Sequence, residues 1–252
     1  MLGVSSIGLG GVLAWKGLGL PWSPLLTWPP TSAAPAYAVG ALLIVAGLGL
    51  LTRRFAAAAG LGPALGWLLL GSPTAVAKPA QFLSWYGVVE SLSFGCGGWM
   101  IASVEGGRLG ALAAHPAGRL AAQSIFGLTL IFYGVSHFLL LDYTASLIPR
   151  LFPDRLALAA FTGAAHIAAG VALVLGVVPR LAVTLEAAML TAFGVIVQIP
   201  TLIAKPAERS QWVEVFASFA LAGAAWAFAA RRRAGPGRSA AAAPPELAPI
   251  SN

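Results

Sequence analysis

Five ionisable side chains of this sequence lie deep inside apolar stretches, where a charge is costly and function is the default reason for keeping one. They are Lys16, Glu90, His137, His166 and Glu186. Histidine can exchange a proton near neutral pH, and a lysine beside a carboxylate can form a buried ion pair. The chemistry open to this chain is therefore proton exchange, ligand contact or charge pairing.

The two histidines could face the interior of one helix bundle. His166 lies between Gly163 and Gly170, and His137 follows Gly134 near the end of the preceding apolar stretch. A proton relay or a quinone contact needs only one or two such rings, whereas the alternative is a histidine satisfied at a helix interface. With no clustered cysteines and no Glu-x-x-His pattern, we expect no metal site.

Two aromatic residues extend this candidate pocket. They are Tyr133, one turn before His137, and Trp212, whose partner Trp85 stands at the matching place in an internal repeat. Both tryptophans are also placed to anchor helix ends at a membrane boundary, where an amphipathic ring is stable. The repeated pair is therefore either a ligand contact or an interfacial anchor.

Lys16 and Glu90 are the candidate intramembrane ion pair. Lys16 is halfway along the first apolar stretch, and Glu90 lies some turns into the fourth, so their depths in a bilayer could overlap. Such a pair could line a proton or ligand path, or it could only satisfy its own two charges.

Glu186, the last of the five side chains, could reach the membrane surface or pair with Arg180.

An internal repeat organises the chain. The pattern around Lys78 recurs 127 residues later around Lys205 with every spacing kept, and Pro73 is matched by Pro200. The matched residues are Ala77, Lys78, Pro79, Ala80, Trp85 and Trp99, and then Ala204, Lys205, Pro206, Ala207, Trp212 and Trp226. Upstream, Gly40 and Gly47 align with Gly163 and Gly170, and Gly10 and Gly17 align with Gly127 and Gly134. A repeat of this length predicts one ancestral unit used twice.

The composition indicates a membrane protein. Hydrophobic residues make up 58% of the chain and charged residues only 9%, against about 25% charged in soluble domains. The net charge of +7 is spread over short loops and a terminal cluster, which indicates membrane orientation and not nucleic-acid binding. The one cysteine, Cys96, excludes an intrachain disulfide and a CxxC pair, and its role is open.

Apolar runs predict an all-α, polytopic fold with eight transmembrane helices in two repeated four-helix bundles. Membrane strands are not expected, because no run alternates over ten residues. The predicted spans are 4–26, 36–52, 55–72, 83–103, 120–141, 157–178, 181–199 and 211–230. The chain divides into a first module at 1–104, a linker at 105–119, a second module at 120–230, and a disordered tail at 231–252 that is basic and then rich in Ala and Pro.

Basic residues set the expected topology. An even number of spans places both termini on one side, and that side carries more Lys and Arg, which favours the cytoplasm. Its residues are Arg53, Arg54, Arg108, Arg119, Arg180, Arg231, Arg232, Arg233 and Arg238, against Lys78, Arg150, Arg155, Lys205 and Arg209 opposite. We expect a multi-pass protein of the cell, or inner, membrane with cytoplasmic termini and the lipid bilayer as its first partner.

The second module contains a set of spaced motifs. They are Gly134-Val135-Ser136-His137-Phe138, the Ile148-Pro149 turn, the Gly163 to Gly170 helix with Arg180 after it, and Gln198-Ile199-Pro200 leading to Lys205-Pro206 and Trp212. These motifs give the module a resemblance to the DoxX family of small four-helix membrane proteins. The resemblance covers 120–230 directly and 4–103 through the repeat. It implies a four-helix unit, in some members linked with thiosulfate:quinone oxidoreduction or with thiol-stress complexes. One cysteine and no cofactor motif depart from a self-sufficient redox enzyme.

Three functions follow as expectations. The first is a membrane subunit of a quinone- or thiol-linked redox complex, with quinone as its ligand and a redox subunit as its partner. The second is a small-molecule or lipid carrier or binding protein without enzymatic activity, because internal repeats are one way to build a substrate path. The third is a purely architectural role. The sequence alone names no catalytic residue and leaves open whether the chain is an enzyme.

Overall fold

The computed structural model describes residues 1–16, 34–52, 55–105 and 107–230, and this part of the chain is helical without a strand. The first half holds α1 (Leu2–Lys16), α2 (Ala34–Leu51), α3 (Ala56–Ala59), α4 (Gly62–Ala77), the 3₁₀ turn η1 (Phe82–Trp85) and α5 (Tyr86–Ala102). The second half holds α7 (Pro116–Leu139), α8 (Leu141–Leu147), α9 (Arg155–Leu175), α10 (Pro179–Phe193), the π-turn η2 (Gly194–Gln198), α11 (Ile199–Ala204) and α12 (Arg209–Ala229), with α6 (Gly107–Ala114) between the halves. The all-helical prediction is confirmed for the described residues.

Local sequence signals explain the ends of the longest helices. Asp154 caps α9 by accepting a hydrogen bond of 2.9 Å from the Ala157 amide. Gly176 ends the same helix in the left-handed region at φ 69°, where glycine has no side-chain clash. Proline stands at the first turn of α7 and of α10, where its missing N–H costs nothing.

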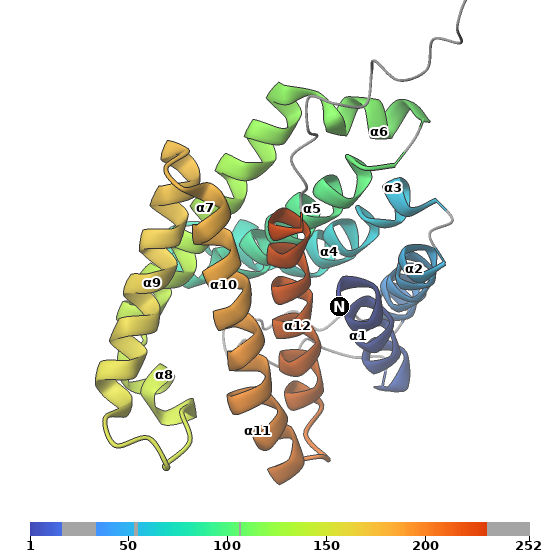
Figure 1. Cartoon of the computed structure of the whole chain (residues 1–252). Helices are drawn as coiled ribbons and strands as arrows, with labels where there is room; N and C mark the ends of the chain where they lie inside the picture. Colours follow the sequence, from blue (N-terminus) through green and yellow to red (C-terminus); the bar gives the residue numbers. More distant parts are fainter. Residues whose placement is uncertain (17–33, 53–54, 106, 231–252) are drawn as a thin grey trace, which may run out of the picture.

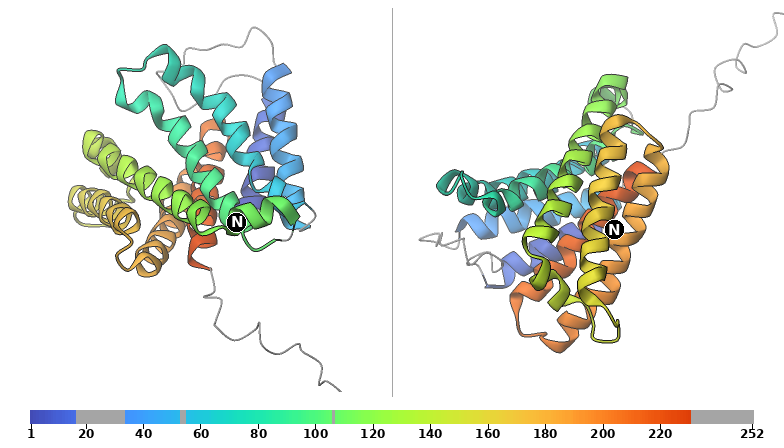
Figure 2. Two further views of the ribbon diagram at one scale, coloured as in Figure 1. Left: turned by 90° about the horizontal axis from the view of Figure 1, so that it is seen from above. Right: turned by 90° about the vertical axis from the view of Figure 1, so that its left-hand side faces the viewer.

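Two apolar cores share a central pair of helices. One core is built from α5, α7, α9, α10 and α12, and the other from α1, α2, α4, α5 and α12. In Figure 1, α12 lies between α10 on one side and α1 on the other, in agreement with its contacts. Figure 2 shows that the α4–α5 hairpin is inclined to the helices of the second half. The central helices α5 and α12 therefore join the two halves.

Glycines bring α1 close to α2 and α7 close to α9 in the same way. A Cβ at Gly10 would lie 2.5 Å from the Gly40 carbonyl oxygen, and one at Gly134 would lie 2.5 Å from that of Gly163. In these contacts Gly10 corresponds to Gly134, whereas the sequence alignment matched Gly10 with Gly127, seven residues earlier. The matching first glycines of the two helices are then Gly3 and Gly127. Gly17, which the sequence aligned with Gly134, lies outside the described residues.

The halves exchange their terminal helices. Helix α1 of the first half packs on α12 of the second, and α7 of the second half packs on α5 of the first. Helices α5 and α12 meet where a Cβ at Gly97 would lie 2.5 Å from that of Ala224, a residue 127 positions later. Two positions that the sequence repeat matches therefore lie against each other at this helix crossing.

The region between the halves differs from the expected linker at 105–119. It contains α6 and the first turn of α7, because Pro116 starts a helix and Ala and Leu continue it. Gly107, at φ 81°, supplies the sharp turn before α6. The tail at 231–252 lies outside the described residues.

Among the described residues, four helices are long and apolar enough to cross a membrane, and all belong to the second half. They are Pro116–Leu139, Arg155–Leu175, Pro179–Ala204 and Arg209–Ala229, the third joining α10, η2 and α11 in one rod. Leu2–Trp15 and Tyr37–Leu51 are apolar but shorter, and α4 and α5 have 16 and 17 residues. A perpendicular helix needs about 20 residues to span a bilayer core.

Candidate functional site

A buried histidine and a buried glutamate form the centre of the candidate site. His166 of α9 and Glu186 of α10 are 6% and 1% exposed, and the His166 Nδ1 atom lies 2.7 Å from Glu186 Oε1. The other carboxylate oxygen, Oε2, is buried with no hydrogen-bond partner among the described residues. A charge without partners is unstable in such an environment, so this pair is a natural place for a proton to be shared.

His137 of α7 joins this pair across the closest helix contact. Its ring centroid is 4.9 Å from that of His166. A side chain at Gly163 would collide with His137, since a Cβ there would lie 2.9 Å from the His137 Cβ. The glycine therefore makes room for the second imidazole, and the two rings lie side by side between α7 and α9.

Hydrogen bonding selects the proton position on His137. Its Nδ1 is 2.9 Å from the Tyr133 carbonyl oxygen, and a carbonyl oxygen only accepts, so Nδ1 carries the hydrogen in this bond. The Nε2 atom of a neutral His137 then carries the lone pair. His166 has the same arrangement when Glu186 is ionised, because its Nδ1–H donates to the carboxylate. Each ring keeps Nε2 for a ligand or a proton.

Beside the histidines, a group of hydrogen-bonded hydroxyls joins α7 to α5. Tyr133 is buried, and its ring centroid is 6.4 Å from that of His166. Its hydroxyl lies 3.1 Å from the Ser93 Oγ, the Ser93 Oγ lies 2.9 Å from the Thr129 Oγ1, and Thr129 donates over 2.7 Å to the Phe126 carbonyl oxygen. Ser93 also lies 3.0 Å from the Val89 carbonyl oxygen, so its one hydrogen is directed to Thr129 or to Val89, and Tyr133 donates to Ser93.

Glu90 makes a separate contact in the first half. Its Oε2 accepts a hydrogen bond of 2.7 Å from the Trp67 indole nitrogen, and the two side chains are 7% and 1% exposed. The backbone of Lys16 ends α1, but its side chain lies outside the described part of the structure. The ion pair between Lys16 and Glu90 stays a prediction, and Trp67 is the partner that the described residues supply.

Trp212 lies apart from the histidine cluster. Its ring packs on Phe216 with centroids 6.2 Å apart, beside the core of α1, α2, α4, α5 and α12, whereas Tyr133 belongs to the other core. Its indole nitrogen donates to the Pro206 carbonyl oxygen over 2.9 Å, and Trp85 donates to that of Pro79 over 3.1 Å. The repeated tryptophans therefore close matching helix-end turns.

Sequence reasoning missed Glu186 as the partner of His166. Arg180, its expected alternative partner, is exposed on the first turn of α10, and Glu186 points into the core. The sequence signal for this pairing was that Glu186 is the single carboxylate of the apolar stretch 181–199, in the same half as the two histidines. Trp67, Ser93 and Thr129 were also missed, because neutral polar residues are common in membrane helices.

In the part of the chain that the structure describes, the fold and the site define a helical protein with four membrane-capable helices and a buried polar cluster between three of them. Within the described ranges, no group of three or more His, Cys, Asp or Glu side chains is arranged to hold a metal ion. Comparison with models of known families, with curated proteins and with solved structures finds no match to this chain.

Proposed function

We propose that this protein is an eight-span, DoxX-like membrane subunit of a quinone-linked redox complex. In this proposal His137, His166, Glu186 and Tyr133 bind the head of a quinone and exchange its protons. The observation that carries the proposal is the pair of imidazole rings 4.9 Å apart, one of them 2.7 Å from a buried carboxylate. Groups that exchange protons are seldom gathered inside an apolar bundle without a function.

The proposed architecture is a tandem duplication of one four-helix unit. Support comes from the matched glycine contacts of α1–α2 and α7–α9, from Gly97 meeting Ala224, and from the helix-end turns at Lys78 and Lys205. These two lysines have nearly equal backbone angles, φ −136° and ψ 60° against φ −137° and ψ 58°. We infer that the shorter helices of the first half are also membrane spans, with both termini in the cytoplasm of a cell with an inner membrane.

The proposed site accepts both protons of a quinol, and a partner subunit accepts both electrons. Oxidation of a quinol to a quinone breaks two O–H bonds and releases two protons and two electrons. The protons pass to the Nε2 atoms of His137 and His166, and the electrons pass to an oxidised redox centre in a partner subunit. Glu186 stabilises the positive charge that a proton places on His166. The chain supplies binding and proton exchange, and the partner supplies the electron acceptor.

Quinone binding by the purified chain in lipid nanodiscs tests the proposal. We expect a short-chain benzoquinone to bind, and replacement of either histidine by phenylalanine to weaken binding by about tenfold, the equivalent of one lost hydrogen bond to a charged or polar group. Glu90→Gln is the matched control, because it alters a buried polar group outside the cluster. Equal binding by the histidine variants, or none by the parent chain, would refute the quinone site.

A carrier is the second candidate function, and the contact between the matched positions Gly97 and Ala224 favours it. Repeats related by an axis of symmetry can place a substrate path between two halves. Solute flux into proteoliposomes would support this function if it depended on residues at the α5–α12 interface. Background flux over a broad panel of solutes would exclude it.

A further inference from the structure

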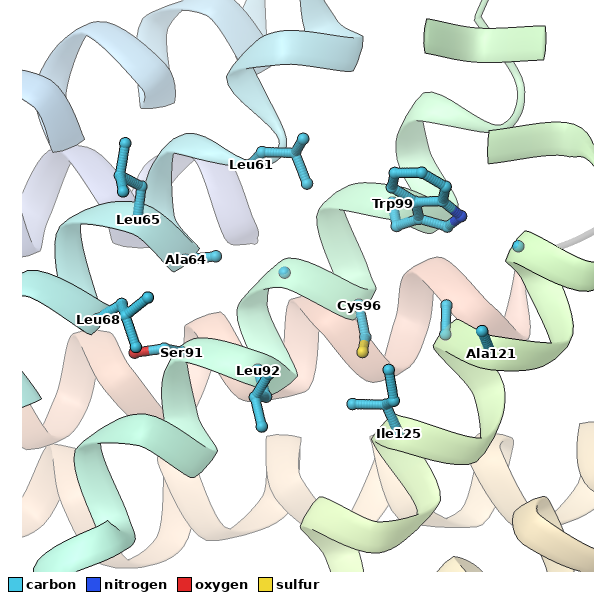
Figure 3. Close-up of a pocket in the computed structure, with 13 residues that line it drawn as sticks. Leu61, Ala64, Leu65, Leu68, Ser91, Leu92, Cys96, Trp99, Ala121 and Ile125 are labelled. Carbon is cyan, nitrogen blue, oxygen red and sulfur yellow. The ribbon is translucent and has the colours of Figure 1, made fainter. Parts of the chain in front are cut away.

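An apolar groove opens between α4, α5 and the first half of α7, away from the two histidines. Its volume is about 490 Å³, and neither His137 nor His166 lines it. This is within the usual range of about 300–1,000 Å³ for small-molecule sites. Figure 3 shows Leu65 and Leu68 of α4 and the preceding Leu61 on one wall, Cys96 and Leu92 of α5 in the middle, and Ala121 and Ile125 of α7 on the opposite wall.

The groove has a defined direction. One end is formed by Leu61, Trp99 and Gly118, and the other by Leu68, Ser91 and Ile125. The lining residues cover eight or nine residues of each segment (61–68, 91–99 and 118–125), so the groove is roughly 10 Å long at about 1.5 Å per residue step. Its first end lies at the ends of helices near α6, and its second lies in the middle of α5. An occupant must be elongated, apolar along its length, and polar only at the Trp99 end.

The Trp99 end holds a hydrogen-bond donor that lacks an acceptor. The Trp99 indole nitrogen is buried and has no hydrogen-bond partner in the described part of the chain. Its counterpart 127 residues later, Trp226, donates over 3.1 Å to the Thr191 hydroxyl. At the place of Thr191 the first half has Ala64, which lines the groove. A buried donor without an acceptor is destabilising, so an oxygen from outside the chain is favoured here.

Charge at the same end favours an anion. Arg119, in the first turn of α7 next to Gly118, has a buried Nε without a partner among the described residues. Arg108 is exposed at the start of α6, and the one acid of this turn, Glu105, precedes it. Two arginines against one glutamate leave the local charge positive. An anionic headgroup oxygen satisfies both the charge and the unpaired donors.

We propose that this groove holds an acyl chain of one anionic phospholipid, with the headgroup at Trp99 and Arg119. The chain lies along the leucines of α4 and the side chains of Leu92 and Ile125, which are on the molecular surface and face lipid in a membrane. Gly118 packs beside the Trp99 indole nitrogen, at the end of the groove where the headgroup is placed. The bound lipid stabilises the contact between α4–α5 and α7.

Lipid retention measured by native mass spectrometry tests this site. The full chain is assembled in nanodiscs of phosphatidylglycerol and phosphatidylcholine and then released into mild detergent. We expect one phosphatidylglycerol to remain on the parent chain. Ala121→Phe should abolish retention, because this exposed residue lines the groove and a ring there fills it. Arg119→Gln should remove the preference for phosphatidylglycerol over phosphatidylcholine.

The tryptophan donor is tested by a matched pair of substitutions. Trp99→Phe removes the unpaired N–H, and Ala64→Thr gives it an internal acceptor like that of Trp226. Each should lower phosphatidylglycerol retention about three- to tenfold, the worth of a single hydrogen bond. Trp226→Phe is the control, because its N–H is already bonded to Thr191, and it should retain lipid like the parent chain.

Three outcomes would overturn the proposal. Ala121→Phe could retain phosphatidylglycerol like the parent chain while eluting as the same folded species. The retained mass could be that of a quinone, which would assign the groove to the tail of the redox ligand. The groove could instead be covered by a second copy of the chain, in which case Ala121→Phe would dissociate a dimer and leave lipid content unchanged.

Discussion

His166 and Glu186 depend on one another, because removal of either side chain leaves the other buried without its hydrogen-bond partner. We expect His166→Leu and Glu186→Leu each to lower the free energy of unfolding by about 3–5 kcal/mol, the usual cost of breaking a buried pair from one side. The double variant should lose less than either single variant. Denaturant unfolding in mixed micelles provides the measurement, and additive losses would show that the two side chains do not depend on each other.

The residues of this site were only partly predictable. His137 and His166 could be paired from sequence, because glycines at fixed spacing in two neighbouring apolar stretches indicate helices that approach closely. Glu186 could not, since its depth depends on where α10 begins, and the helix starts at Pro179. The Glu90–Trp67 bond needs the α4–α5 packing, which no local pattern reports.

At the scale of whole helices, the close contact between α7 and α9 depends on glycine. A Cβ at Gly170 would overlap the Gly127 carbonyl oxygen, so Gly170→Ala must push α9 away from α7. We expect a loss of about 1–3 kcal/mol, typical of an overpacked core. Gly11→Ala is the control, because nothing lies within 4 Å of its added methyl group. The control should be neutral or slightly stabilising, as alanine favours helix over glycine.

Unfolding of both variants in the same mixed micelles checks this prediction. The His137–His166 contact should loosen together with α9, so quinone binding should weaken in Gly170→Ala and stay unchanged in Gly11→Ala. Equal stability of the two variants would mean that the α7–α9 contact tolerates a wider spacing than the structure shows.

Some elements were predictable and others were not, for identifiable reasons. The four membrane-capable helices of the second half were placed to within about five residues, because long apolar runs between Pro, Gly or charge mark their ends. The helix α6 was predicted as a linker, since glycines around Gly107 resemble a loop although the following residues favour a helix. The π-turn at 194–198 precedes Pro200, whereas the matching Pro73 stands inside the α-helix α4, so no sequence rule locates such a turn.

At the scale of the whole molecule, the repeat predicts two units but not how they join. Sequence similarity favours two separate four-helix bundles, whereas each core of the structure takes helices from both halves. The reason is energetic: α1 covers part of its apolar face with α12, and α7 does so with α5. Which partner covers an apolar face is decided by the assembled shape and not by local pattern.

This exchange predicts that neither half is stable alone. Expressed separately, 1–104 and 107–230 would each leave an apolar face of α1, α5, α7 or α12 without its partner, and both fragments should be degraded or aggregate. Expressed together, they should assemble and purify as one complex through an affinity tag on either fragment. Gly97→Leu should abolish the complex, because its side chain collides with Ala224 at the crossing of α5 and α12. Gly11→Leu, at a position with free space, should not. A stable, monomeric second half in detergent would contradict the shared cores and restore two independent bundles.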